Sequence, residues 1–229
     1  MSNTKHFIDI DQLNLSVLTD IMGRSVAMKT ALKTGKLDYP MEGRTLVMIF
    51  EKPSTRTRVS FQVGFQQMGG MTVVMGDQES QLGRGETLAD TARVLSRYAD
   101  AIMIRTDDPG KLQDLADYAS VPVINGLTDD SHPCQIMADI MTYEEHRGSL
   151  VGKTVAWVGD GNNVTTSWIH AAVKFGFTLK IGCPESLQPD ADVVASAQER
   201  GGDILLANSA QEAVDGADLV TTDTWVSMG

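Results

Sequence analysis

The chain contains 229 residues, of which 42% are hydrophobic and 21% are charged, and its formal net charge is −11. This length accommodates one large globular domain or two small ones, the acidic balance argues against general nucleic-acid binding, and the apolar runs are too short to span a bilayer. The two cysteines, Cys134 and Cys183, are too few for a four-cysteine zinc site or a disulfide framework.

Short apolar runs alternate with amphipathic segments along almost the whole chain, which predicts an α/β fold built from parallel strands. In the first half we expect helices over residues 13–32, 58–68, 87–98 and 109–118. The strands that we expect there cover residues 45–50, 72–75, 101–105 and 121–125.

A long predicted helix, residues 133–146, leads to a predicted boundary near Arg147 and Gly148. After it we expect strands over 154–158, 178–182, 204–206 and 217–222, and helices over 164–175, 191–200 and 210–215. The pattern predicts two doubly wound parallel-sheet domains, residues 1–147 and 148–229. We expect the second to be incomplete, because it is short and stops directly after a strand.

The segment that follows the first predicted strand is rich in side chains that bind anions. Ser54, Thr55 and Thr57 place hydroxyl groups at the start of a helix, where unpaired backbone N–H groups already attract negative charge. Arg56 and Arg58 add two guanidinium groups, which are disfavoured at this end of a helix unless an anion compensates them. A capped helix with solvated arginines is the alternative. Because no Walker pattern is present, a compact phosphorylated metabolite fits better than a nucleotide.

Polar side chains also follow two other predicted strands. Arg105 ends the strand 101–105, and charged groups at the carboxyl end of a parallel strand face the crevice where α/β proteins bind ligands. His132 and Gln135 stand at the start of the long helix, with Pro133 at its first position. A solvated arginine and a capping histidine are the ordinary alternatives, so each signal is moderate by itself.

The loop after residue 158 partly matches a dinucleotide-binding fingerprint. Gly159 and Gly161 match its first two glycines, and Glu185 lies where an acid would contact a ribose. Val164 stands where the third glycine would permit close helix packing, which weakens this interpretation.

Amide and acidic groups in the second half suggest another kind of ligand. Asn162 and Asn163 open a predicted helix and could hold a carboxylate there. Asp223 follows the last predicted strand, where it could bind an amine or serve only as a loop acid.

Together these segments resemble the aspartate/ornithine carbamoyltransferase family, and most closely its ornithine branch. The similar stretches are Ser54 to Arg58, His132 to Gln135, the loop 80–86 that contains Gln81, the loop 159–164, and the ending with Asp223 and Ser227 to Gly229. Aspartate enzymes usually carry lysine in place of Gln81 and lack this ending.

The resemblance implies transfer of a carbamoyl group from carbamoyl phosphate to the δ-amine of L-ornithine, without a metal or other cofactor. It implies that carbamoyl phosphate is bound by Ser54, Thr55, Arg56, Thr57, Gln81, Arg105, His132, Pro133, Cys134 and Gln135. Among these, the implied catalytic residues are Arg56, Arg105, His132 and Gln135. The residues implied for ornithine are Asn163, Asp223, Ser227 and Met228.

The family also implies a homotrimer in which Gln81 reaches a neighbouring subunit, and a role in arginine biosynthesis. Residues 1–9 contain no apolar signal core and are not rich in arginine, so we expect a cytoplasmic protein. The family's later His-Cys-Leu-Pro segment and its C-terminal helix are not found in this sequence. We therefore expect carbamoyl phosphate binding with poor turnover, and two alternatives stay open: a non-catalytic carbamoyl phosphate-binding protein and a nicotinamide-dependent oxidoreductase.

Overall fold

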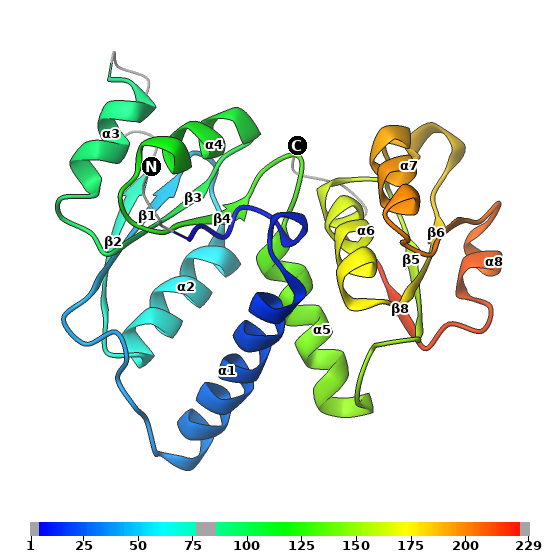
Figure 1. The fold of residues 1–229 in the computed structure, drawn as a ribbon, viewed down its shortest axis with the longest axis horizontal. Coiled ribbons are helices and arrows are strands. Elements are labelled where there is room, and N and C mark those ends of the chain that lie inside the picture. The colour runs from blue at the N-terminus through cyan, green and yellow to red at the C-terminus, as the bar shows by residue number, and fades with distance from the viewer. Residues whose placement is uncertain (1–4, 77–85, 225–229) are drawn as a thin grey trace. The chain divides into compact units, whose positions relative to one another are not determined.

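The computed structural model describes residues 5–76 and 86–224, which fall into two compact units (Figure 1). The first unit consists of Met1–Ile8 and Asp20–Thr128, and the second of Asp9–Thr19 and Asp129–Gly229. Each unit is described by itself below. The division at Thr128 lies before the long helix, whereas the boundary predicted at residue 147 lies after it. In the described part of the chain no helix is both long enough and apolar enough to cross a membrane.

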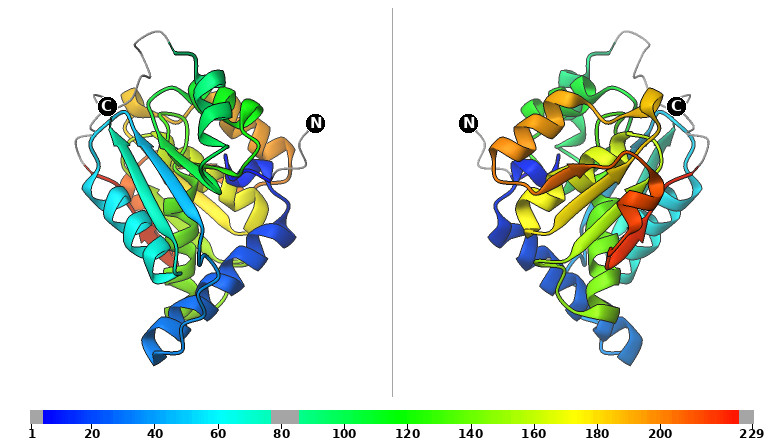
Figure 2. Two further views of the ribbon diagram at one scale, coloured as in Figure 1. Left: turned by 90° about the vertical axis from the view of Figure 1, so that its left-hand side faces the viewer. Right: turned by 90° about the vertical axis from the view of Figure 1, so that its right-hand side faces the viewer.

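The first unit is built around a parallel sheet of four strands in the order β2-β1-β3-β4. The strands are β1 (Thr45–Phe50), β2 (Met71–Gly76), β3 (Ala101–Arg105) and β4 (Val123–Leu127). The helices are α2 (Thr55–Gln67), α3 (Leu88–Leu95) and α4 (Pro109–Tyr118), while α1 (Leu15–Thr34) runs across the division between the units. Figure 2 shows β1 and β2 side by side in its left-hand view.

Both faces of the inner strand β1 are buried, as its continuous apolar run requires. Alternate residues of a strand point to opposite faces, so Met48 packs on one side with Phe65 of α2, and Ile49 packs on the other with Leu112 and Leu115 of α4. The centre of the sheet is therefore covered on both sides, which confirms the doubly wound arrangement predicted for this unit.

The second unit contains another parallel sheet of four strands, in the order β7-β6-β5-β8. The strands are β5 (Thr154–Val158), β6 (Thr178–Gly182), β7 (Ile204–Leu206) and β8 (Leu219–Thr221). The helical segments are η1 (Ile10–Gln12), α5 (Pro133–Arg147), α6 (Asn163–Phe175), η2 (Glu185–Leu187), α7 (Ala191–Glu199) and α8 (Ala210–Val214). Its core includes Trp157, Trp168 and Phe177, all almost fully buried, and the rings of Trp168 and Phe177 meet edge to face.

Of the elements whose bounds differ from the sequence prediction, three do so for a clear physical reason. Helix α2 begins at Thr55 rather than at residue 58, because Ser54 is the last extended residue before the helix. Helix α3 ends at Leu95, after which the backbone N–H groups of Arg97 and Tyr98 bond to carbonyls three residues back. The short helices η1 and η2 were not predicted.

The third difference concerns β4, which covers Val123–Leu127 rather than residues 121–125. Gly126 sits at a shift in register, where Ile104 pairs with Asn125 but Arg105 pairs with Leu127. A Cβ atom at Gly126 would lie 2.5 Å from the Met103 Sδ atom, so a larger residue there would force the buried Met103 side chain to move. The sequence prediction ended the strand at this glycine, although the strand continues through it.

Candidate functional site

Strand order places the candidate residues of the first unit at one end of the sheet. The chain leaves β1 towards β2 on one side, and β3 lies on the other, so the order of the strands reverses between β1 and β3. Such a reversal is where open α/β sheets bind ligands, just beyond the carboxyl ends of the strands. Phe50 and Arg105, the last residues of the two strands, pair with each other. The predicted phosphate segment therefore starts beside Arg105.

The phosphate segment forms the first turn of α2. Ser54 is the N-cap residue, but its side chain makes no capping hydrogen bond. Thr55 and Arg56 are exposed, whereas Thr57 is buried and its Oγ1 atom accepts a hydrogen bond of 3.1 Å from Nη1 of Arg105. The bond joins the end of β3 to the start of α2, so hydroxyl and guanidinium groups lie together at the positive end of a helix.

The electrostatics of Arg105 favour an anionic ligand. Burial lowers the pKa of this guanidinium, and the nearby charge of Arg56 lowers it further. The Nε atom of Arg105 is buried and has no hydrogen-bond partner within the described residues. A buried donor without an acceptor is costly, and an anion at this position would supply both an acceptor and the opposite charge.

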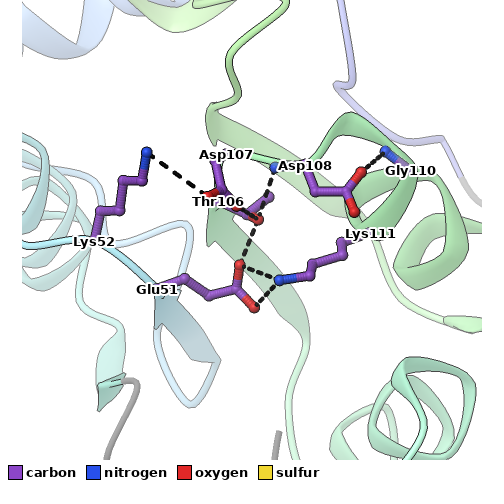
Figure 3. A network of polar contacts seen from close by, with 7 residues as sticks. All are labelled: Glu51, Lys52, Thr106, Asp107, Asp108, Gly110 and Lys111. Carbon is purple, nitrogen blue, oxygen red and sulfur yellow. Dashed lines mark hydrogen bonds and ion pairs between the residues drawn. The ribbon is translucent and has the colours of Figure 1, made fainter. Parts of the chain in front are cut away.

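A second set of polar contacts connects β1 to β3 beside this segment (Figure 3). Both carboxylate oxygens of Glu51 accept from Lys111 Nζ, at 3.0 and 2.9 Å, and Glu51 Oε2 also accepts from the hydroxyl of Thr106. The backbone N–H of Glu51 donates to the carbonyl of Arg105. The hydrogen bond to Glu51 is the main cause that raises the pKa of Lys111. This group, Glu51 with Thr106 and Lys111, fixes where each strand ends, and we call it the Glu51 cluster.

The second unit has its own strand-order reversal, between β5 and β8. Asn162 follows β5 and caps α6, since its Oδ1 atom accepts from the backbone N–H groups of Val164 and Thr165. Its Nδ2 atom donates to Oδ2 of Asp223, which follows β8, at 3.2 Å. Asn163 is the first residue of α6. Two of the residues predicted to bind ornithine, Asn163 and Asp223, thus stand at one reversal point.

The contacts of Gly161 argue against a dinucleotide. A Cβ atom there would lie 2.2 Å from the backbone N of Pro189, and the N–H of Gly161 donates to the carbonyl of Leu187. In a dinucleotide fold the second glycine lets the cofactor approach the backbone. Here the protein's own chain already occupies that approach, so the partial fingerprint serves packing.

His132 and its neighbours connect to α6 within the second unit. The backbone N–H of His132 donates to Oγ of Ser167 at 2.7 Å, and this hydroxyl donates in turn to the carbonyl of Asn163 at 3.0 Å. Pro133 is buried at the first position of α5, and burial raises the pKa of the Cys134 thiol to about 12, which makes this cysteine a poor nucleophile. The loop that carries His132 is thereby held to the start of α6.

Gln135 lies one turn away from Asp139 on α5. Its Nε2 atom donates to Oδ1 of Asp139 at 2.8 Å, so its amide oxygen faces away from this bond and can accept another. Burial raises the pKa of Asp139, the bond from Gln135 opposes this shift, and the charge of Asp223 adds to it. The charge of Asp223 therefore acts on the residue that orients Gln135.

The predicted site residues divide between the two units. Ser54, Thr55, Arg56, Thr57 and Arg105 belong to the first, and His132, Pro133, Cys134, Gln135, Asn163 and Asp223 belong to the second. Gln81, Ser227 and Met228 lie outside the described residues. The roles given to all these side chains stay predictions.

Comparison with known proteins also divides the chain into two domains, but near the end of α5 rather than at Thr128. Residues 5–145 match the model of the carbamoyl-P binding domain of aspartate/ornithine carbamoyltransferases, and residues 151–229 match that of the Asp/Orn binding domain. The chain belongs to the aspartate/ornithine carbamoyltransferase family. The resemblance inferred from the sequence is thereby confirmed.

Relatives within this family are similar over the whole chain. An ornithine carbamoyltransferase of Rhodopseudomonas palustris is 54% identical over 235 residues, which cover 100% of this chain and 75% of the relative. One from Agrobacterium fabrum is 54% identical over 228 residues, with the same coverage. Among solved structures, the ornithine carbamoyltransferase of Pyrococcus furiosus superposes with a TM-score of 0.93 at 45% identity, and covers 100% of this chain and 74% of its own.

Sequence reasoning missed several residues that contact the candidate site residues or lie beside them. Thr106 and Lys111 of the Glu51 cluster, Ser167 behind His132, and Asn162 as a partner of Asp223 have no short-range sequence signal. Lys111 is 60 residues from Glu51, and Asn162 is 61 residues from Asp223. The contacts of Thr106, Lys111 and Asn162 depend on the strand order, which makes the end of β1 a neighbour of the end of β3, and the end of β5 a neighbour of the end of β8.

Proposed function

We propose that this chain transfers the carbamoyl group of carbamoyl phosphate to the δ-amine of L-ornithine, which yields L-citrulline and phosphate. The observation that carries this proposal is that one family domain contains a cationic reversal point and the other contains an acid-and-amide reversal point. Relatives named ornithine carbamoyltransferase, 54% identical over the whole chain, support the choice of ornithine as acceptor.

In this proposal the first unit holds the phosphate. Ser54, Thr55, Arg56 and Thr57 surround it at the start of α2, where hydroxyls, a guanidinium and backbone N–H groups all donate. Arg105 is oriented by its hydrogen bond to Thr57 and lies against the carbamoyl oxygen. Burial and the nearby Arg56 disfavour the charge of Arg105, and a bound phosphate would compensate that charge.

The second unit supplies the rest of the carbamoyl contacts and the acceptor site. His132 joins Arg105 in polarising the carbamoyl oxygen, and the amide oxygen of Gln135, turned outwards by Asp139, accepts from the carbamoyl NH₂ group. Pro133 and Cys134 contribute the backbone of the same turn. Asn163 holds the α-carboxylate of ornithine.

The α-amine of ornithine is assigned to Asp223 and Ser227, with backbone from Met228. This assignment rests on the family resemblance for Ser227 and Met228, and on position for Asp223, which stands beside Asn162 and two residues beyond β8.

The reaction needs no covalent intermediate. The neutral δ-amine attacks the carbamoyl carbon, and the new C–N bond forms as the oxygen becomes an oxyanion stabilised by Arg105 and His132. The C–O bond to phosphate then breaks, and the departing phosphate accepts the proton from the nitrogen. Much of the acceleration comes from holding two substrates in reactive geometry.

A direct assay tests the function. Purified chain is incubated with carbamoyl phosphate and ornithine, and citrulline and phosphate are measured together. We expect the two products in equal amounts after the spontaneous hydrolysis of carbamoyl phosphate is subtracted, and no phosphate above that background when ornithine is replaced by aspartate. Carbamoyl phosphate binding without citrulline would instead support the non-catalytic alternative, and neither binding nor product would contradict the proposal.

We further propose a homotrimer in which Gln81 completes the site of a neighbouring subunit, with a cytoplasmic role in arginine biosynthesis. These finer assignments rest on the family resemblance. Mixing Gln81→Ala with Arg56→Ala chains tests the shared site, because hybrid trimers contain sites that receive both residues intact. Recovery of activity on mixing is expected. With subunit exchange verified, the absence of recovery contradicts a shared site.

A further inference from the structure

We propose that Asn162 is a positioning residue that holds the Asp223 carboxylate in place for the amine of the acceptor substrate. The inference deepens the proposed function, since it assumes that Asp223 binds the α-amine of ornithine. No role was predicted for Asn162 beyond a possible grip on a carboxylate, and the structure gives it different partners.

Both ends of the Asn162 amide are engaged. The Oδ1 atom accepts from the backbone N–H groups of Val164 at 3.0 Å and Thr165 at 3.2 Å, which fixes the side chain to the first turn of α6. The Nδ2 atom then points to the other loop and donates to Asp223 Oδ2 at 3.2 Å. One rigid side chain therefore connects a helix start to a loop acid.

Asp223 needs such a support because it stands outside regular structure. Strand β8 ends at Thr221, so the backbone at Asp223 is not held by the sheet ladder. A loop carboxylate that binds an ammonium group must be held within a narrow range of positions to be productive, and ordering it in advance lowers the cost of binding. Asn162 engages Oδ2, and a carboxylate has further acceptor capacity for a substrate ammonium.

The choice of asparagine at position 162 supports this positioning role. Serine, aspartate and asparagine are all good N-cap residues, because each offers an oxygen to the helix N–H groups. Of these, only asparagine combines that acceptor with an NH₂ group that can donate to a carboxylate at the same time. If residue 162 only capped α6, aspartate or serine would serve as well.

This property gives a sharp test with two variants. Asn162→Asp keeps the cap, removes the donor and places a second negative charge beside Asp223. Asn162→Ser keeps a capping oxygen and adds no charge, and it removes the amide NH₂ group that reaches Asp223, because the only donor of serine is the O–H of the capping atom itself. For both we expect a melting temperature close to that of the wild type, unchanged carbamoyl phosphate affinity, and an ornithine KM raised roughly tenfold or more, with a smaller change in kcat.

Asp190→Asn is the matched control. Asp190 caps α7 through the N–H groups of Asp192 and Val193, so the variant exchanges an acid and an amide at a cap of the same kind in the same unit. Its ornithine KM should equal that of the wild type. A similar KM increase in the control would mean that any cap change in this unit disturbs the site, and would overturn the inference.

The other possible outcomes of these experiments also test the inference. An unchanged ornithine KM in Asn162→Ser overturns the inference, because an effect limited to Asn162→Asp would be charge repulsion rather than lost positioning. Equal losses for both substrates together with a lower melting temperature would show a purely structural role and overturn it too. If the wild-type chain neither binds nor converts ornithine, the proposed function fails first, and the inference falls with it; calorimetry with ornithine alone, before any variant is made, identifies that case.

Discussion

The two units close the amino ends of their sheets in the same way and differ at the carboxyl ends. In the first unit, Asp100 directly precedes β3, accepts from the backbone N–H of Thr45 at the start of β1, and pairs with Arg44. In the second unit, Asp218 directly precedes β8, accepts from the N–H of Thr154 at the start of β5, and pairs with Lys153.

At the opposite ends this similarity disappears. Beyond β1 and β3 stand Arg56 and Arg105 with the Glu51 cluster, whereas beyond β5 and β8 stand Asn162 and Asp223. The strand orders of the two sheets differ, but each contains a reversal, and the two reversals support two chemistries, a cationic site and an acid-and-amide site. The comparison teaches that the amino ends fix the alignment of the central strands, while the loops at the carboxyl ends determine what each sheet can bind.

The largest expected effect tests the cationic site. Arg56→Ala should weaken carbamoyl phosphate binding about tenfold to a hundredfold, since a charge-assisted contact contributes about 1.5–3 kcal/mol. Arg58→Ala, another exposed arginine of the same helix turn, should cost much less. Calorimetric titration of both variants checks this, and equal affinities for Arg56→Ala and the wild type would remove Arg56 from the site.

A substitution at Gly161 tests how closely the loop after β5 packs against the backbone of Pro189 in the second unit. Gly161→Ala should lower the free energy of unfolding by about 1–3 kcal/mol, because the new methyl group meets the backbone of Pro189. Gly64→Ala, in α2 with no atom near the added methyl, should instead raise it by about 0.5–1 kcal/mol. Urea unfolding measures both. A neutral Gly161→Ala would mean that the loop has room, and the argument against a dinucleotide would weaken.

The two ends of β1 can be compared directly. Glu51→Gln, which weakens the contact with Lys111, should lower carbamoyl phosphate affinity about threefold to tenfold, because the ends of β1 and β3 lose their alignment. Asp100→Asn disturbs the same two strands at their amino ends and should reduce thermal stability with no change in this affinity. If both variants lose affinity alike, the separation between alignment and binding is wrong.

The smallest expected effect depends on pH. Burial raises the pKa of Asp139 in the folded state, so its ionised form destabilises the fold at neutral pH, and this cost disappears as the pH falls below the ordinary aspartate range. Asp139→Asn keeps an acceptor for Gln135 and should raise the melting temperature slightly at pH 7 but not near pH 3. Asp117→Asn, in the exposed Gln113–Asp117 pair, is the control and should give no gain at pH 7.

Much of the fold followed from the sequence, because hydrophobic periodicity is strong in this chain. The bounds predicted for β1, β3, β5, β6 and α4 agree with the structure. Where the prediction failed, a tertiary contact outweighed the local signal: Gly126 continues β4 where a side chain would force the neighbouring Met103 to move, although glycine ordinarily indicates a strand end.

The candidate site was predictable to a different degree. Side chains grouped in a short segment, such as Ser54 to Arg58 and His132 to Gln135, were found from helix-start chemistry. The partners that orient them were not, because Thr106, Lys111 and Ser167 are ordinary residues whose importance depends on which strand ends and helix starts are neighbours in space. Hydrophobic periodicity predicts the helices and strands, whereas these contacts can be predicted only when the arrangement of the strands and helices in space is known.

The outer edge of β4 is covered by the segment before η1. Phe7 exchanges backbone hydrogen bonds with Val123 and Asn125, and the N–H of Val123 donates to Nδ1 of His6 at 3.1 Å. The last bond requires a neutral imidazole, and burial lowers the pKa of His6, with Asp117 opposing the shift. The stabilisation is therefore complete above the ordinary histidine pKa and declines as the solution becomes more acidic. Protonation of one imidazole thus weakens the cover of this β-strand edge, and an uncovered edge can pair with another chain.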